Sequence, residues 1–200
     1  MPKWRSIVVG AMLLLITSPG AAATAAGDYS VIEPALSRMA ELSASEAQLK
    51  TQFDYLSRNG NSTCSRAFMD SIASMPEDFR LQGSCCSPMS FHRYSEQLEG
   101  LKNYNQIAEI PSNPYDVPAA IAKKLLTYYD LDLTAEEKEV YDYAMQNSDE
   151  KGPCCCACWR WHVYGGVAKL LIRDHGFTGQ QVAEVWDLSD GCGGEGDHVH

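Results

Sequence analysis

Residues 153–175 read PCCCACWRWHVYGGVAKLLIRDH, a cysteine run that leads directly into an amphipathic segment. His175 falls in the last turn of that segment and Gly176 follows it, as at the C-terminal end of many helices. The segment therefore predicts a helix whose beginning carries several thiols. Its apolar residues have the spacing of one helical face: Trp159, Val163, Val167, Leu170 and Leu171.

The same periodicity continues through most of the chain. A long amphipathic helix, or a kinked pair, is expected from Val31 to Leu56, and a shorter helix from about Thr63 to Met75. There is no strong strand pattern, so we expect an all-α fold, a single small domain of about six to seven helices with cysteine-bearing loops. Four further segments have helical apolar spacing: 89–98, 121–126, 140–144 and 182–186.

Two helix starts are expected from short local signals. Ser87 followed by Pro88 has the pattern of an N-cap with proline at the first helical position. Cys85 and Cys86 should then lie just before a helix. Asp116 is expected to cap the helix that follows the loop at residues 111–114.

Two later helix starts carry a stronger signal. Thr134 with Glu137, and Thr178 with Gln181, have the spacing of a capping box, in which each side chain bonds the backbone of the other residue. Both pairs stand immediately before an apolar periodic segment. We therefore expect helices to begin at these two positions.

The N-terminus has the order of a secretory signal. Lys3 and Arg5 precede an apolar run from Ile7 to Ile16 and then small residues. This order predicts cleavage after Ala23 or Ala26 and a periplasmic or secreted protein. The apolar run is shorter than the ~20 residues that cross a bilayer, so no membrane span is expected after cleavage.

These signals divide the chain into three regions. Residues 1–26 are expected to be a signal peptide, 27–190 a helical cysteine-rich domain, and 191–200 a flexible Gly/His tail. The formal net charge is −10, and it becomes more negative when the basic signal is removed. An acidic surface repels phosphate backbones and anionic membranes, so nucleic acid and membrane surfaces are not expected partners.

Cysteine usage is the most distinctive chemical feature of the sequence. In an exported protein an even number of cysteines suggests disulfide bonds. However, most of these cysteines fall in two tight groups, and neighbouring cysteines pair poorly with each other. A domain of this size also folds without covalent staples. The eight are Cys64, Cys85, Cys86, Cys154, Cys155, Cys156, Cys158 and Cys192.

The larger group has the composition of a soft-metal site. It consists of Cys154, Cys155, Cys156 and Cys158, followed by His162. If the helix has begun at Cys158, then Cys158 and His162 share a face. Thiolates with an imidazole are a ligand set for Zn(II) or, with fewer ligands, for Cu(I).

The second group combines thiols with a thioether and an imidazole. Cys85 and Cys86 precede Met89 and His92, and on the expected helix the last two share a face beside the thiols. This softer set suits Cu(I) better than Zn(II). Because both groups lie where helices are expected to begin, we expect them to meet in one cluster. A third, weaker possibility combines Cys192 with two tail histidines, His198 and His200.

Residues 153–158 also resemble a known motif. Pro153-Cys154-x-Cys156-x-Cys158 is similar to the P-C-x-C-x-C frame of the PCYCGC-motif proteins, with Cys155 and Ala157 at the tyrosine and glycine positions. The resemblance implies bacterial export and thiol or metal chemistry. It supplies no catalytic residues.

The sequence thus favours an exported protein that binds Cu(I) or Zn(II) through clustered thiolates and a histidine. Two alternatives stay open: a disulfide-stapled structural or interaction protein, and a thiol redox protein. No hydrolase motif or phosphate-binding glycine loop is present, and no organic cofactor is indicated.

Overall fold

A computed structural model of the chain describes residues 33–193. Within them the all-α prediction is confirmed. The predicted signal peptide and residues 194–200 of the predicted tail lie outside this range. None of the described helices is both long and apolar enough to cross a membrane. There are seven: α1 (Glu33–Arg58), α2 (Arg66–Ser71), α3 (Phe91–Leu101), α4 (Ala119–Tyr129), α5 (Ala135–Asn147), α6 (Trp159–His175) and α7 (Gly179–Ser189).

The chain divides into two units, residues 1–40 and residues 41–200, and the boundary falls within α1. Only the first turns of α1 are described for the first unit. The second unit holds the other six helices and all eight cysteines.

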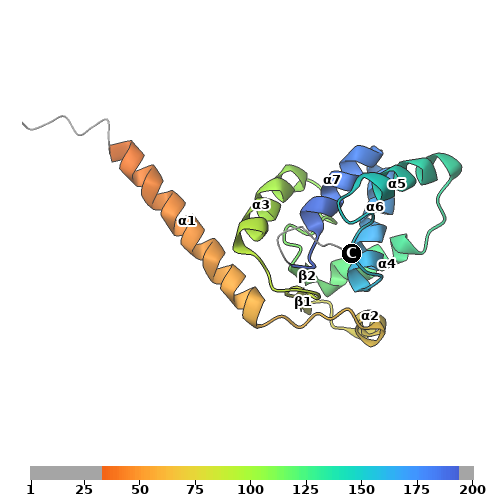
Figure 1. Cartoon of the computed structure of the whole chain (residues 1–200), viewed down its shortest axis with the longest axis horizontal. Helices are drawn as coiled ribbons and strands as arrows, with labels where there is room; N and C mark the ends of the chain where they lie inside the picture. The colour runs from red at the N-terminus through yellow and green to blue at the C-terminus, as the bar shows by residue number, and fades with distance from the viewer. Residues whose placement is uncertain (1–32, 194–200) are drawn as a thin grey trace, which may run out of the picture. The chain divides into compact units, whose positions relative to one another are not determined.

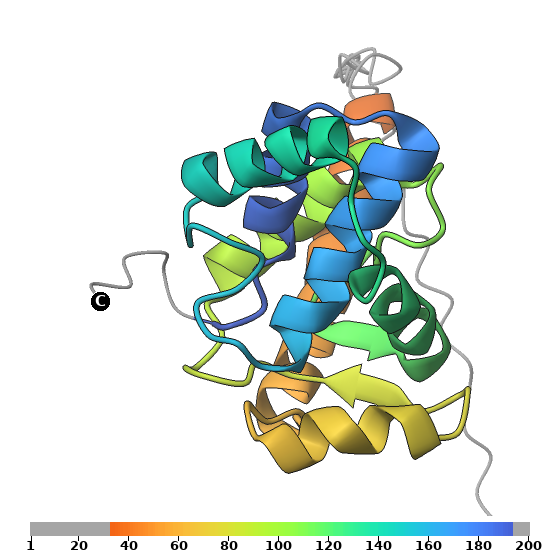
Figure 2. The same cartoon turned by 90° about the vertical axis from the view of Figure 1, so that its right-hand side faces the viewer.

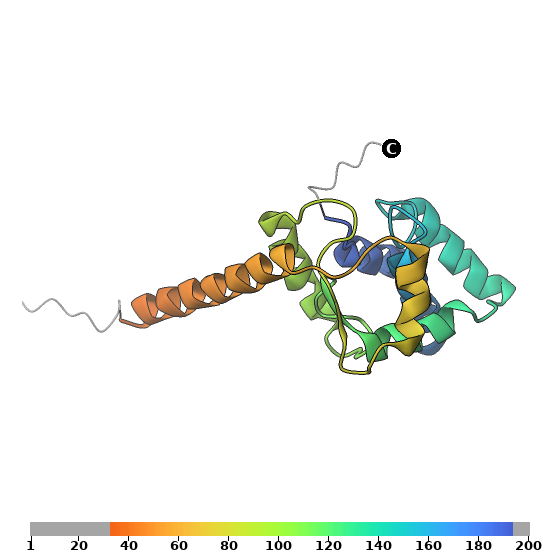
Figure 3. The same cartoon turned by 90° about the horizontal axis from the view of Figure 1, so that it is seen from below.

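Helix α6 is the central element of the second unit. It packs against α2, α4, α5 and α7 (Figure 2), and Figure 3 shows α2 beside the beginning of α6. Its Trp159, Val163 and Val167 are fully buried in the main hydrophobic core. The predicted apolar face is therefore the face that the other helices cover.

The capping boxes are confirmed. Thr134 accepts a hydrogen bond from the amide of Glu137 at the start of α5, and Thr178 accepts one from the amide of Gln181 at the start of α7. In both cases the second side chain accepts a hydrogen bond from the backbone amide of the capping threonine. Gly176 ends α6 in the left-handed conformation, with φ +64°.

The prediction of a helix start at Ser87 is wrong. Helix α3 begins at Phe91, and its N-cap is Ser90. The amide and the hydroxyl of Ser87 both donate to the carbonyl of Cys192, at 2.9 and 3.0 Å. This long-range contact fixes the backbone of residues near Pro88 outside the helix.

The prediction for Asp116 is also wrong. Asp116–Pro118 forms strand β2, which pairs antiparallel with β1 (Arg80–Gln82), and α4 begins only at Ala119. Arg80 Nε donates to the Asp116 carboxylate at 2.9 Å. Proline favours an extended conformation in the residue before it, so the strand precedes the helix here. Figure 1 labels both strands.

Candidate metal centre

The eight cysteines come from four segments that lie outside the helices and strands. Cys64 stands between α1 and α2, and Cys85 and Cys86 between β1 and α3. Residues 154–158 join α5 to α6, with Cys158 as the N-cap of α6. Cys192 follows α7. Because these segments are loops, the rest of the fold must hold them together.

The first two segments are joined by a close approach of two glycines. Gly83 has φ +78°, and a Cβ there would lie 2.5 Å from Gly60 Cα. Only glycine meets both conditions. The hydroxyl of Ser62 also donates to the carbonyl of Gly83 at 3.1 Å. As a result Cys64 Sγ lies 3.4 Å from the carbonyl oxygen of Cys85.

Cys192 is held by residues of α3 and of the loop before it. Its carbonyl accepts the two bonds from Ser87, and its amide donates to Asp190 Oδ1 at 3.1 Å. Arg93 pairs with the other oxygen of Asp190 at 3.3 Å, and Gln97 donates to the Asp190 carbonyl at 2.6 Å. These bonds fix the position of a thiol that local sequence does not mark.

The predicted flexible tail therefore begins too early. Residues 191–193 are buried, and Cys192 is fully so. Gly193, at φ +82°, packs against the carbonyl of Ser87, where a Cβ would lie 2.2 Å from the oxygen. The end of the described chain is thus part of the cysteine site.

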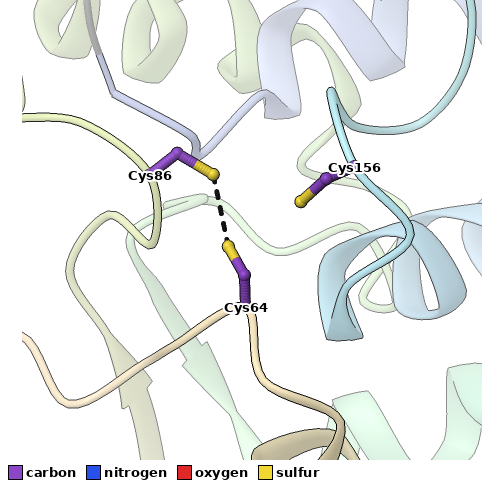
Figure 4. A group of neighbouring side chains, drawn as sticks. All are labelled: Cys64, Cys86 and Cys156. Atoms are coloured by element: carbon purple, nitrogen blue, oxygen red, sulfur yellow. Dashed lines mark hydrogen bonds between the residues drawn. The ribbon is translucent and has the colours of Figure 1, made fainter.

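All eight sulfur atoms belong to one contiguous cluster, which we call the thiol cluster. The expectation that the two cysteine groups meet is confirmed. Figure 4 shows Cys64, Cys86 and Cys156 pointing toward one another from three segments. The Sγ–Sγ distances include Cys64–Cys86 3.2 Å, Cys85–Cys86 3.8 Å, Cys86–Cys155 3.7 Å, Cys155–Cys192 3.0 Å, Cys154–Cys192 3.0 Å and Cys154–Cys158 3.7 Å.

Within the thiol cluster the sulfurs form groups that could each hold a metal ion. In each group three Sγ atoms lie within 4.8 Å of one another. The groups are Cys64/Cys86/Cys156, Cys64/Cys85/Cys158, Cys85/Cys86/Cys192, Cys154/Cys155/Cys192 and Cys154/Cys156/Cys158.

The cluster runs from the surface into the interior. Cys86 is exposed, whereas Cys154, Cys158 and Cys192 are buried and the other four are intermediate. All eight cysteines are free. The shortest of the distances above, 3.0 Å, is well beyond the ~2.05 Å of a disulfide bond.

The other predicted ligands are not members of these groups. His162 Nδ1 is 2.9 Å from the backbone oxygen of Cys158, and its ring packs against Tyr129 at 4.6 Å between centroids. Met89 belongs to a separate apolar cluster around Leu56 and Tyr94. None of the five groups found in residues 33–193 includes a histidine.

His92 also lies away from the thiols. It is exposed on α3, where its Nε2 is 3.2 Å from Glu96 one turn further along the helix. Cys64 is the candidate ligand that local pattern missed, because it stands alone in the sequence, and Cys192 was considered only with the tail. The signal that could have found both is their residue type, because they are the two cysteines that remain outside the two local groups.

A buried positive charge adjoins the thiol cluster. Arg160, in the first turn of α6, is fully buried and donates to the carbonyls of Gly83, at 2.8 Å, and Pro114. No ion pair found in residues 33–193 includes Arg160. Burial alone would lower the pKa of Arg160, but negative charge on nearby groups, Cys85 foremost, raises it overall. The N-terminus of α6 adds positive potential on the same side.

Contacts among the thiols shift their pKa values in different directions. Hydrogen bonds from Cys158 and Cys192 lower the pKa of Cys85 to about 4, although burial opposes the shift. The charge on Arg160 acts in the same direction. By contrast, burial and the neighbouring thiols raise the pKa of Cys64. The shifts of Cys85 and Cys64 are thus opposite in direction, and Arg160 favours the ionised form of Cys85.

This arrangement can bind metal through sulfur. Ionised thiolates are strong ligands for soft ions, and a metal ion can ionise the remaining thiols by taking the place of their protons. Buried Arg160 would offset part of the negative charge that results. Comparison of the chain with protein-family models, with curated proteins and with solved structures found no match.

Proposed function

We propose that this protein is exported and binds soft metal ions, Cu(I) or Zn(II), through its cysteine thiolates. The observation that carries the proposal is that all eight cysteines of the chain converge on one place from four separate segments. Groups of three thiols within 4.8 Å of one another are suitable ligand sets for either ion.

The position of the thiol cluster argues against a role in holding the fold together. The main core is built from apolar residues of α3 to α7, of both strands and of the segments beside them, and it contains none of the cysteines. Disulfides stabilise mainly by restricting the unfolded chain, and a domain with an extensive apolar core does not depend on that gain. Hydrogen bonds and glycine contacts already join the segments that carry Cys64, Cys85, Cys86 and Cys192.

Buried Arg160 supports the proposal independently. A guanidinium stays charged at any physiological pH, and burying it without a counter-charge costs several kcal/mol. Its hydrogen bonds go to two uncharged carbonyls, so ionised thiols, Cys85 foremost, are the groups that can offset that charge. A metal–thiolate centre that carries net negative charge would neutralise it.

The competing candidate is a redox function, in which pairs of cysteine thiols are oxidised to disulfides and reduced again. If the protein is oxidised, the distances favour a Cys64–Cys86 bridge, at 3.2 Å, and a bridge from Cys192 to either Cys154 or Cys155, both at 3.0 Å. Formation of either bridge would release two electrons and two protons to an acceptor. It would also remove two metal ligands.

Intact-mass measurement distinguishes the two functions. The full chain is purified without oxygen, offered Cu(I) or Zn(II), and weighed under native and denaturing conditions beside Cys154→Ser. We expect metal to be retained under native conditions, all eight thiols to be recovered on denaturation, and less metal in Cys154→Ser. Metal binding would be refuted if the folded protein retained no more metal than its unfolded form and its mass showed the loss of two hydrogens for each bridge.

Export is a separate part of the proposal, and it is supported by the order of charged, apolar and small residues at the N-terminus. N-terminal sequencing of the protein from the cells that make it should find Thr24 or Gly27 as the first residue. Recovery of an intact Met1 with the cytosolic fraction would contradict export and leave metal binding untouched.

A further inference from the structure

We infer that the thiol cluster holds several Cu(I) ions as one polynuclear cluster in which thiolates bridge neighbouring ions. This deepens the proposed function and rests on it. The inference concerns how the ligands are shared, and sharing depends on the relative placement of the sulfurs.

The first observation is that the ligand groups overlap. The five groups of three thiols are drawn from only eight cysteines. Seven of the eight belong to two groups each, and Cys155 alone belongs to one. Eight thiols supply at most two groups of three with no member in common, so a third ion would have to share sulfur atoms with the others. A thiolate has enough lone pairs to bridge two ions, whereas separate mononuclear sites need separate ligands.

The second observation is that each group has three members. A structural Zn(II) ion takes four ligands in a tetrahedron, and at a Zn–S length near 2.3 Å its sulfurs all lie about 3.8 Å apart. None of the five groups in the described residues has a fourth thiol. Three sulfurs about 4 Å apart fit a three-coordinate ion at a similar metal–sulfur length. Three-coordination by thiolates is a geometry of Cu(I).

Charge balance also calls for several cations in the thiol cluster. The thiol cluster is partly buried, so the charge that eight thiolates would carry there must be offset. Each Cu(I) adds one positive charge, and bridging lets several ions enter without further ligands. Arg160 adds one more positive charge from the buried side. Several monovalent ions with one guanidinium thus offset most of the thiolate charge.

Two cysteines give a matched pair of variants. Cys86 belongs to two groups and is exposed, whereas Cys155 belongs to one group and is half-buried. Serine at either position removes one thiol, and neither side chain is fully buried, so both variants should fold. If thiolates bridge ions, Cys86→Ser should lose about two ions and Cys155→Ser about one.

The experiment is an anaerobic titration of the full chain with Cu(I) against a chromogenic Cu(I) chelator. It is followed by native mass spectrometry and X-ray absorption at the copper edge. We expect several Cu(I) per chain, three sulfurs around each copper, a short Cu–Cu distance and a larger loss in Cys86→Ser than in Cys155→Ser. Circular dichroism of both variants checks that the helices are intact.

The possible failures are distinguishable. One or two coppers per chain, each with two sulfurs and no Cu–Cu distance, would overturn the polynuclear cluster and leave metal binding standing. Equal losses in the two variants would overturn the bridging pattern. Retention of tetrahedral Zn(II) in competition with Cu(I) would overturn the choice of ion, and retention of no metal at all would overturn the proposed function as well.

Discussion

Replacing Arg160 with methionine tests whether the buried guanidinium serves the thiol cluster. Methionine has a similar length and no charge, so Arg160→Met keeps much of the packing at the start of α6. It removes the bonds to the carbonyls of Gly83 and Pro114 and the positive charge beside Cys85. Arg160→Lys keeps the charge and is the matched control.

The expected effect differs between the metal-free and the metal-loaded protein. Without metal, the lost charge-assisted hydrogen bonds, about 1.5–3 kcal/mol each, are largely offset because a buried charge is also removed. With metal, the thiolates lose a neighbouring positive charge. At an effective dielectric constant near 20, two unit charges about 5 Å apart attract by about 3 kcal/mol, which corresponds to roughly 100-fold in affinity.

The assay has two parts. Denaturant unfolding of the metal-free protein should change by less than about 2 kcal/mol in Arg160→Met. Competition with a Cu(I) or Zn(II) chelator should show affinity falling by roughly 100-fold in Arg160→Met and by far less in Arg160→Lys. Wild-type metal affinity in Arg160→Met would refute the reasoning, because the charge would then have no effect on the site.

Three further predictions concern single residues. In the chelator assay, His162→Ala should lower metal affinity less than any cysteine-to-serine change, because the His162 ring bonds a backbone oxygen and packs outside the five groups. A loss of affinity equal to that of a cysteine variant would show that His162 is a ligand. Gly191→Ala should destabilise the protein by about 1–3 kcal/mol in denaturant unfolding, because its Cβ would lie 2.0 Å from Nη1 of Arg160. Burial raises the pKa of Asp187 to about 6, so its contribution to stability is full below about pH 4 and is lost as pH rises through 6. Asp187→Asn can still accept the bond from the amide of Asp149 and should stabilise the protein at pH 7 by about 1 kcal/mol after solvent screening, an effect that disappears near pH 4.

Local signals in the sequence predicted the parts of the fold that local contacts determine. The capping boxes at Thr134 and Thr178 and the glycine end of α6 depend on residues within a few positions of each other, and all three were predicted correctly. The helix starts at Ser87 and Asp116 were wrong because distant residues decide them. Ser87 bonds Cys192, and Asp116 pairs with a strand that lies more than thirty residues earlier.

The same distinction explains the site. Six of its eight thiols stand in two local groups and could be found by spacing, whereas Cys64 and Cys192 reach the site only through tertiary contacts. Spacing also assigned His162 and Met89 as ligands because both were placed on helices that began with thiols. Cys158 is instead the N-cap of α6, and Met89 precedes α3 and packs against α1. Met89 therefore lies outside the expected helix, whereas His162 stays one turn from Cys158 but its ring contacts the backbone oxygen of Cys158 rather than the sulfurs of the five groups.

The way the loops are held suggests that binding does not require the fold to rearrange. Zinc fingers fold around their metal because they have little other core. In this chain the core is apolar and complete without the cysteines. The segments of Cys64, Cys85, Cys86 and Cys192 are fixed by Gly83, by Asp190 and by the carbonyl of Cys192, and Cys158 is the N-cap of α6. The ligands are thus already close to one another, so little conformational entropy is lost when metal binds. Metal should raise the unfolding free energy with the logarithm of its concentration relative to its Kd, and the helices should be present before it is added.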